Sequence, residues 1–150
     1  MSQVTIRSGK KEDVPQIFEL VKELAAYERA EHEVDNTVEQ LMEDGFGENP
    51  LYGVIVAEVQ NKIVGMSLYY YRYSTWKGKR LYIEDIIVTG NFRGLGIGKQ
   101  LFEETIKTAK RTNCTGLMWM VLDWNEPAIK FYLKYGAVMD REWVSVSLPK

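Results

Sequence analysis

The chain has 150 residues, of which 45% are hydrophobic and 27% are charged, a composition typical of one globular domain with a substantial core. Its net charge of −2 lacks the excess of Lys and Arg expected of a nucleic-acid-binding surface. The single cysteine, Cys114, excludes an internal disulfide framework and fits a reducing compartment. No segment has the roughly 18 apolar residues of a membrane span, and no N-terminal run resembles a signal peptide. We therefore expect one cytoplasmic domain, residues 1–150, that binds neither nucleic acid nor membrane.

The N-terminal third predicts a strand followed by two helices. Residues 3–7 alternate in polarity as a strand does. Asp13 can cap a helix, because the apolar residues after it recur at helical spacing. A shorter helix is expected from about Val38 until Gly45 stops it.

The middle of the chain predicts three strands. Residues 51–59 and 63–73 are rich in β-forming side chains, and Gln60-Asn61-Lys62 between them indicates a hairpin. A second turn is expected at residues 76–79. Residues 81–88 are almost continuously apolar, which is typical of a strand covered on both faces.

The C-terminal part predicts a glycine-rich loop at residues 90–98, a helix to about Arg111, a strand over 116–122, a helix capped by Asn125, and a last strand over 142–148. The inward stripe of the longer helix is expected to be Ile97, Leu101, Thr105 and Ala109. The resulting order β-α-α-β-β-β-α-β-α-β predicts a mixed sheet with helices on its faces, in the α/β or α+β range.

The segment Arg93-Gly94-Leu95-Gly96-Ile97-Gly98 joins a buried strand to a helix. Glycines allow a ligand to approach the main chain closely, and the N–H groups at a helix start favour an anion such as pyrophosphate. The Arg93 side chain could add a charge-assisted contact. A P-loop is excluded by Arg93 and Gln100, and the spacing of the glycines differs from a dinucleotide fingerprint. A tight turn without a ligand also fits the spacing.

Glu84 and Asp85 interrupt the apolar run. Adjacent strand residues point to opposite faces, so a covered strand buries at least one of these carboxylates. A buried carboxylate persists when it is paired, lies beside a cleft or does chemistry. A structural ion pair with Lys or Arg is therefore the alternative to a functional role.

The other residues that could serve in catalysis or binding also have purely structural interpretations. Tyr132 lies three residues after Ile129, a spacing that by itself indicates a core position. The acidic residues 28–39 can steer a cation or form a solvated surface, and only Glu28 is favoured for binding. One histidine and one cysteine, far apart, argue against a zinc site or a Cys-His nucleophile.

The glycine segment matches the Q/R-x-x-G-x-G/A acetyl-CoA motif, so the chain resembles the GNAT superfamily of N-acetyltransferases. Further segments resemble the branch that contains spermidine/spermine acetyltransferase and a paralogue that prefers thialysine: Tyr27-Glu28, Glu43-Asp44-Gly45-Phe46-Gly47, Val56-Ala57-Glu58-Val59, Tyr82-Ile83-Glu84-Asp85, Trp124-Asn125-Glu126-Pro127 and Phe131-Tyr132. Residues 73–78 and 121–125 resemble the thialysine paralogue more closely, since the spermidine enzyme carries an acidic residue where this chain has Ser74. The segment after Gly136 is shorter here than in either relative.

The resemblance implies a GNAT fold, a homodimer, and acetyl-CoA as co-substrate without a metal. It implies direct acetyl transfer to a primary amine of a small diamine or lysine analogue such as thialysine. A polyamine acetyltransferase, a protein-lysine acetyltransferase and a non-catalytic acetyl-CoA sensor stay open as alternatives.

The resemblance also implies roles for individual residues. Main-chain groups of Ile86, Ile87 and Val88 would pair with the pantetheine arm. The pyrophosphate would be cradled by Arg93, Gly94, Leu95, Gly96, Ile97, Gly98 and Lys99, and Asn125 would contact the cofactor. Tyr132 would protonate the departing thiolate, and Glu84 would relay the amine proton. Amine binding would involve Tyr27, Glu28 and Asp85.

Overall fold

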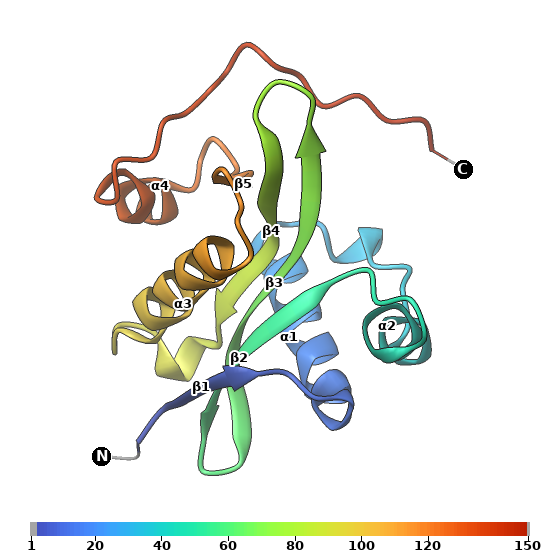
Figure 1. Ribbon diagram of the computed structural model, residues 1–150. Coiled ribbons are helices and arrows are strands. Elements are labelled where there is room, and N and C mark those ends of the chain that lie inside the picture. The colour runs from blue at the N-terminus through green and yellow to red at the C-terminus, as the bar shows by residue number, and fades with distance from the viewer. Residues whose placement is uncertain (1–2, 150) are drawn as a thin grey trace. The chain divides into compact units, whose positions relative to one another are not determined.

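A five-stranded mixed sheet organises the first 120 residues in the computed structural model, which describes residues 3–149 (Figure 1). The strands, in their order across the sheet, are β1 (Thr5–Ser8), β2 (Gly53–Val59), β3 (Lys62–Ser74), β4 (Gly78–Val88) and β5 (Leu117–Trp119). Neighbours from β1 to β4 are antiparallel, and β5 joins β4 in parallel. The predicted α/β fold class is confirmed.

The helices are α1 (Val14–Tyr27), α2 (Val38–Phe46), α3 (Ile97–Arg111) and α4 (Glu126–Leu133), with short 3₁₀ turns η1 (Lys11–Asp13), η2 (Glu31–Glu33) and η3 (Gly90–Phe92). The chain divides into two compact units: residues 1–120 contain the sheet and α1 to α3, and residues 121–150 contain α4. None of the helices in residues 3–149 has the length and apolar character needed to cross a membrane.

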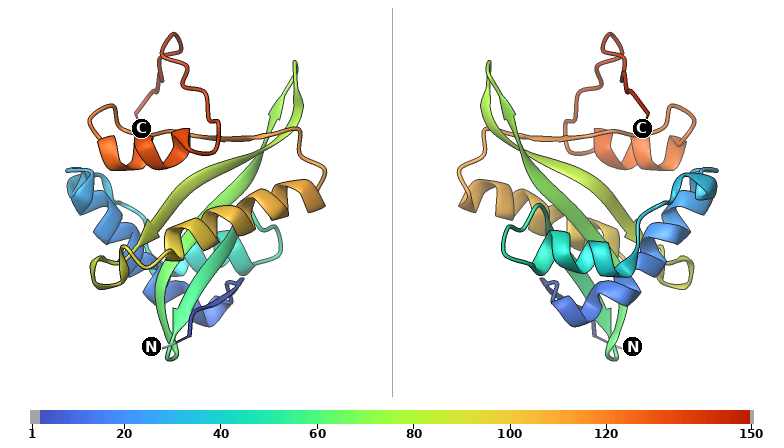
Figure 2. Two further views of the ribbon diagram at one scale, coloured as in Figure 1. Left: turned by 90° about the vertical axis from the view of Figure 1, so that its left-hand side faces the viewer. Right: turned by 90° about the vertical axis from the view of Figure 1, so that its right-hand side faces the viewer.

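Helices cover both faces of the sheet in the first unit. Figures 1 and 2 show α1 and α2 on one face and α3 on the other. The core on the α1 face includes Val14, Ile17, Val56, Met66, Leu68 and Ile87. The core on the α3 face includes Ile55, Ala57, Val64, Ile97 and Leu101. Strands buried on both sides explain the continuous apolar runs of the sequence.

The inward stripe predicted for α3 is confirmed, because all four of its members are buried. The polar member, Thr105, places its Oγ1 2.8 Å from Ser67 Oγ on β3 and 2.7 Å from the Leu101 carbonyl oxygen. Both hydroxyls are fully buried, so this pairing removes the cost of two unsatisfied polar groups.

The predicted hairpin between β2 and β3 is confirmed. Gln60 and Asn61 both adopt left-handed backbone conformations, with φ of 49° and 66°. Two such residues form the turn whose twist matches that of antiparallel strands. Asn61 is one of the non-glycine residues that tolerate this conformation best.

The prediction that Asp13 caps α1 with its side chain is wrong in detail. The Asp13 carboxylate accepts hydrogen bonds from Arg7 (2.8 and 3.1 Å) and from the Lys10 backbone N–H (2.7 Å). Arg7 holds the pKa of this carboxyl below its ordinary value. Because the carboxylate is hydrogen-bonded to Arg7 and Lys10, it connects β1 to η1 and forms no capping hydrogen bond with the first turn of α1. The cap predicted at Asn125 is confirmed, since its Oδ1 accepts from Ala128 N–H at 3.4 Å.

The last predicted strand, residues 142–148, does not form, and β5 is limited to Leu117–Trp119 instead of spanning 116–122. The alternating side chains of Val144, Val146 and Leu148 are 80, 90 and 96% exposed. An alternating pattern becomes a strand only when its backbone joins a ladder, and this segment joins none in the described part of the chain.

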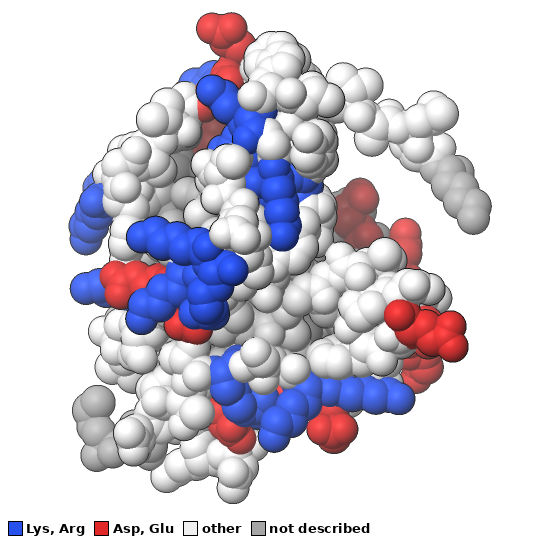
Figure 3. All heavy atoms as spheres, viewed as in Figure 1, with Lys and Arg blue, Asp and Glu red and all other residues white. Residues whose placement is uncertain are grey.

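Charges of both signs occur on the face drawn in Figure 3, and neither sign covers that face alone. The distribution matches the small net charge of the sequence.

Candidate active site

The two acidic residues of β4 are placed by a β-bulge. Leu68 of β3 faces Asp85, whereas its neighbour Tyr69 faces Ile83, so Glu84 is the extra residue without a direct partner. Directly paired residues of antiparallel strands share a face. Asp85 therefore lies with Leu68 on the face that α1 covers.

Strict alternation would have placed Asp85 on the α3 face. Ile83 pairs with Tyr69 of the α3 face, and Ile86, three residues later, also packs in the α3 core. An odd separation between residues on one face is possible because the bulge inserts one residue. The expectation that Glu84 and Asp85 follow simple alternation is corrected by this geometry. The expected burial holds only in part, since Asp85 is half-buried and Glu84 is exposed.

Three carboxylates interact at this bulge. Burial raises the pKa of Asp85 to about 7, and the negative charges of Glu84 and Glu28 add to the shift. Burial also raises the pKa of Glu28, which follows the last residue of α1, and Glu84 adds to it. No Lys or Arg forms an ion pair with these three residues in the described chain. A structural ion pair is therefore not their explanation, and a cationic ligand would relieve their repulsion.

Two tyrosines stand beside this acidic cluster, which we define as Glu28, Glu84 and Asp85. Tyr70 and Tyr82 face each other on neighbouring strands, with ring centroids 5.2 Å apart. Burial, followed by the charge of Glu84, raises the pKa of both phenols. Both therefore stay protonated at neutral pH, when each can donate a hydrogen bond. Sequence reasoning had not assigned Tyr82, although it lies two residues before Glu84.

The backbone of β4 has one unpaired edge next to the cluster. The ladder with β5 ends at the pair Ile83–Trp119, whereas the ladder with β3 continues to Val88. Residues 85–88 are thus paired with a strand on one side only, within the part of the chain that is described. The other edge of this segment, which includes Ile86, Ile87 and Val88, is open to an extended ligand; the expected pairing of these three residues with a pantetheine arm stays a prediction.

The glycine loop that follows β4 has the backbone geometry of an anion cradle. Gly94 and Gly96 have left-handed φ angles of 79° and 83°, and Gly96 begins α3. A Cβ built at either position would have no atom within 4 Å. The first N–H groups of α3, from Ile97 to Lys99, have no intrahelical acceptor, so they are suited to a phosphate.

The Arg93 side chain is directed to α1. Its Nε donates to the Val88 carbonyl oxygen at 2.9 Å, its Nη2 pairs with Glu23 at 3.3 Å, and its guanidinium lies 5.6 Å from the centre of the Tyr27 ring. Tyr27, expected to bind amine, therefore lies against the cofactor loop. Glu23 was missed in the sequence, where its only signal is its position one helical turn before Tyr27.

The second unit contains the other two predicted residues. Asn125 caps α4, and the Tyr132 ring on the same helix contacts Phe131 with centroids 5.5 Å apart. Both residues are thus held by local structure at the two ends of one short helix.

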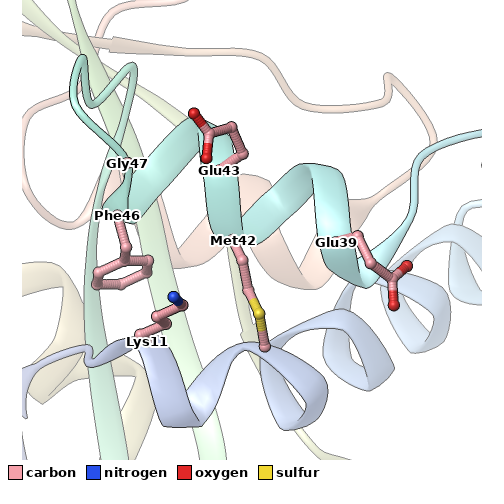
Figure 4. Close-up of a pocket in the computed structure, with 6 residues that line it drawn as sticks. All are labelled: Lys11, Glu39, Met42, Glu43, Phe46 and Gly47. Carbon is pink, nitrogen blue, oxygen red and sulfur yellow. The ribbon is translucent and has the colours of Figure 1, made fainter.

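A separate pocket of about 260 Å³ lies between η1 and α2 (Figure 4). Met42 and Phe46 point from α2 toward Lys11, and the remaining lining residues are Glu39, Glu43 and Gly47. It shares no residue with the acidic cluster or the glycine loop. No group of three or more His, Cys, Asp or Glu residues within 3–149 is arranged to hold a metal ion.

Comparison with known proteins agrees with this geometry. Residues 14–137 match the acetyltransferase (GNAT) family. Thialysine N-epsilon-acetyltransferase of Bos taurus is 41% identical over 91% of this chain and 85% of its own length. Spermidine/spermine N(1)-acetyltransferase-like protein 1 of Homo sapiens is 37% identical over 92% of this chain and 21% of its own length. The solved integron cassette protein of V. cholerae superposes with a TM-score of 0.78 at 26% identity, covering 98% of this chain and 93% of that one.

The chain therefore belongs to the acetyltransferase (GNAT) family. It is an acetyl-CoA-dependent N-acetyltransferase, as the family and the related acetyltransferases show.

The cradle geometry predicts that Gly96→Val weakens binding of CoA. The substitution forces a β-branched side chain into a left-handed conformation and into the space open to a ligand. We expect a loss of affinity of about five- to thirtyfold, because the loop can relieve strain of about 1–2 kcal/mol only by leaving the conformation that binds the ligand. Isothermal titration calorimetry with CoA measures it.

The matched control is Gly136→Val, which should bind CoA as wild type does. Gly136 has a similar left-handed φ angle of 80° and is equally uncrowded, but it lies outside the glycine loop. Equal CoA affinity of wild type and Gly96→Val would contradict the cradle.

Proposed function

We propose that this enzyme transfers the acetyl group of acetyl-CoA directly to a primary amine of a small diamine or lysine analogue such as thialysine. The observation that carries the proposal is the cluster of Glu28, Glu84 and Asp85, which forms no ion pair with Lys or Arg within residues 3–149 and lies beside the unpaired edge of β4. Several relatives at 37–41% identity are named thialysine N-epsilon-acetyltransferases.

The chemistry requires a proton acceptor. An unperturbed lysine-like amine has a pKa of about 10.4, so about one molecule in 2,500 is neutral at pH 7, and deprotonation costs about 4.6 kcal/mol. Asp85, with a pKa near 7, can hold the ammonium form of the substrate and exchange a proton with it at neutral pH. Glu84 is exposed, and in this mechanism it relays the amine proton to solvent through water.

The cofactor takes its position from β4 and the glycine loop in this proposal. The pantetheine arm pairs with the backbone of residues 86–88, the pyrophosphate lies on residues 93–99, and Asn125 contacts the cofactor. A backbone N–H close to Ile86 stabilises the tetrahedral oxyanion. Tyr132 then protonates the departing CoA thiolate and regains a proton from solvent. The transfer is uphill by about 1.5 pKa units, since the pKa of an unperturbed thiol is about 8.5 and that of tyrosine about 10. No step requires a metal.

A polyamine acetyltransferase is the second candidate, because three carboxylates can hold a substrate with more than one cationic centre. Ser74 disfavours it. Its Oγ accepts hydrogen bonds from the N–H groups of Trp76 and Lys77 at 3.2 and 3.0 Å, so this residue closes the β3–β4 turn and supplies no charge.

We also infer that residues 1–150 form one catalytic domain, because the family match runs from residue 14 to 137 across both units. A homodimer in the cytoplasm is proposed from the resemblance to diamine acetyltransferases.

The substrate proposal predicts a preference within an amine panel. CoA release is measured with acetyl-CoA and thialysine, lysine, ornithine, diaminopropane, putrescine, spermidine or a histone-tail peptide. We expect the highest kcat/KM for thialysine or a short diamine, since the acidic cluster can hold and deprotonate one amine, and Ser74 supplies no charge for the additional cationic centre of a polyamine. Preference for spermidine would favour the polyamine candidate. Preference for the peptide, or CoA binding with no turnover on any amine, would contradict both.

The acid role predicts that Tyr132→Phe lowers kcat by about 10²-fold or more, because general acid catalysis contributes roughly 10²–10⁴. The dissociation constant of CoA should change little, since the phenyl ring is kept. Tyr135→Phe on the same segment is the control and should retain wild-type turnover. Wild-type kcat in Tyr132→Phe would remove this residue as the acid.

A further inference from the structure

Glu23 connects α1 to the beginning of the cofactor loop. One carboxylate oxygen accepts from Thr89 Oγ1 at 2.7 Å. The other accepts from the Gly90 N–H at 3.1 Å and from Arg93 Nη2 at 3.3 Å. Three donors from residues 89–93 thus converge on one side chain that is 66 to 70 positions earlier in the sequence.

These contacts constrain the loop at both ends of its first turn. The Thr89 N–H donates to the Val64 carbonyl oxygen at 2.8 Å, which fixes the end of β4 on β3. Arg93 is held by the Val88 carbonyl oxygen, the Glu23 carboxylate and the Tyr27 ring. The chain therefore enters Gly94 from a fixed position, although Gly94 and Gly96 by themselves are the most permissive residues of the loop.

The ion pair between Glu23 and Arg93 also affects the electrostatic potential at the loop. A lone carboxylate beside a phosphate site would repel the ligand. Arg93 neutralises Glu23, so the carboxylate can organise the loop without leaving a net negative charge next to it. The same pairing holds the guanidinium at α1, so the backbone N–H groups supply the phosphate contacts.

We propose that Glu23 is a positioning residue for the cofactor: by holding Thr89, Gly90 and Arg93, it orients the loop of residues 94–99 toward the pyrophosphate of acetyl-CoA. This inference rests on the proposed cofactor site. Glu23 itself touches neither substrate nor cofactor.

The test is Glu23→Gln, which keeps the size of the side chain and removes its charge. We expect binding of CoA to weaken on the order of five- to tenfold, since hydrogen bonds to a charged group are lost at a partly exposed site. Dephospho-CoA should lose the same factor, because it keeps the pyrophosphate. In kinetics, KM for acetyl-CoA should rise by a similar factor, while kcat and the amine KM stay within about twofold.

Glu19→Gln is the matched control. Glu19 lies one turn earlier on α1, and within residues 3–149 its ion pair is with the exposed Lys22, so CoA affinity should be unchanged. Thr89→Val removes one of the three donors without changing a charge. Its effect on CoA affinity should be smaller when added to Glu23→Gln than when made alone, because both changes break the same contact.

Comparing Glu23→Gln with Gly96→Val distinguishes a failure of the positioning role of Glu23 from a failure of the proposed cofactor site. If wild type binds CoA and Gly96→Val does not, but Glu23→Gln binds as tightly as wild type or more tightly, the positioning role is overturned and the cradle stands. Tighter binding would mean that Glu23 only withholds Arg93 from the ligand. If Gly96→Val binds CoA as wild type does, the proposed cofactor site is overturned together with this inference.

Discussion

The proposed active-site chemistry of this protein depends on one inserted residue in β4. The bulge at Glu84 turns Asp85 from the α3 face of the sheet to the α1 face, where Glu28 follows the end of α1. Burial and the repulsion between these carboxylates then raise the pKa of Asp85 to about 7. A carboxylate of this kind is costly without a cation, so the fold retains an unfavourable arrangement that the proposed amine substrate would relieve.

Helix α1 contributes to both halves of the proposed reaction. Its last turns present Glu23 and Tyr27 to the cofactor loop, and Glu28 follows immediately in the acidic cluster. The helix is anchored over the sheet by buried Val14, Ile17 and Leu20, so both contacts depend on the same packed core. The residues proposed to bind the amine and those proposed to position the cofactor loop are therefore held by one helix.

Local sequence signals predicted most of the fold. The Gln60-Asn61 turn, the Asn125 cap and the inward stripe of α3 each follow from the chemistry of neighbouring residues. The strand over 142–148 was predicted for the same reason and is wrong, because alternation describes side chains and does not guarantee a partner for the backbone.

The site was harder to predict because its decisive features are non-local. Alternation placed Glu84 and Asp85 on opposite faces, and nothing in the sequence marks the bulge that changes this arrangement. Glu23 was missed because its partners lie 66 to 70 residues away. The glycine loop, in contrast, was recognisable, since left-handed backbone at Gly94 and Gly96 requires a particular residue type at each position.

The raised pKa of Asp85 can be measured directly by titrating its carboxyl with carbon-13 NMR, in wild type and in Glu84→Gln. Burial at the bulge predicts a midpoint at about pH 7 in wild type. Removing the Glu84 charge should lower that midpoint, because a like charge disfavours ionisation. A wild-type midpoint near 4, unchanged in Glu84→Gln, would contradict the account: Asp85 would then be a solvated carboxylate outside the acidic cluster.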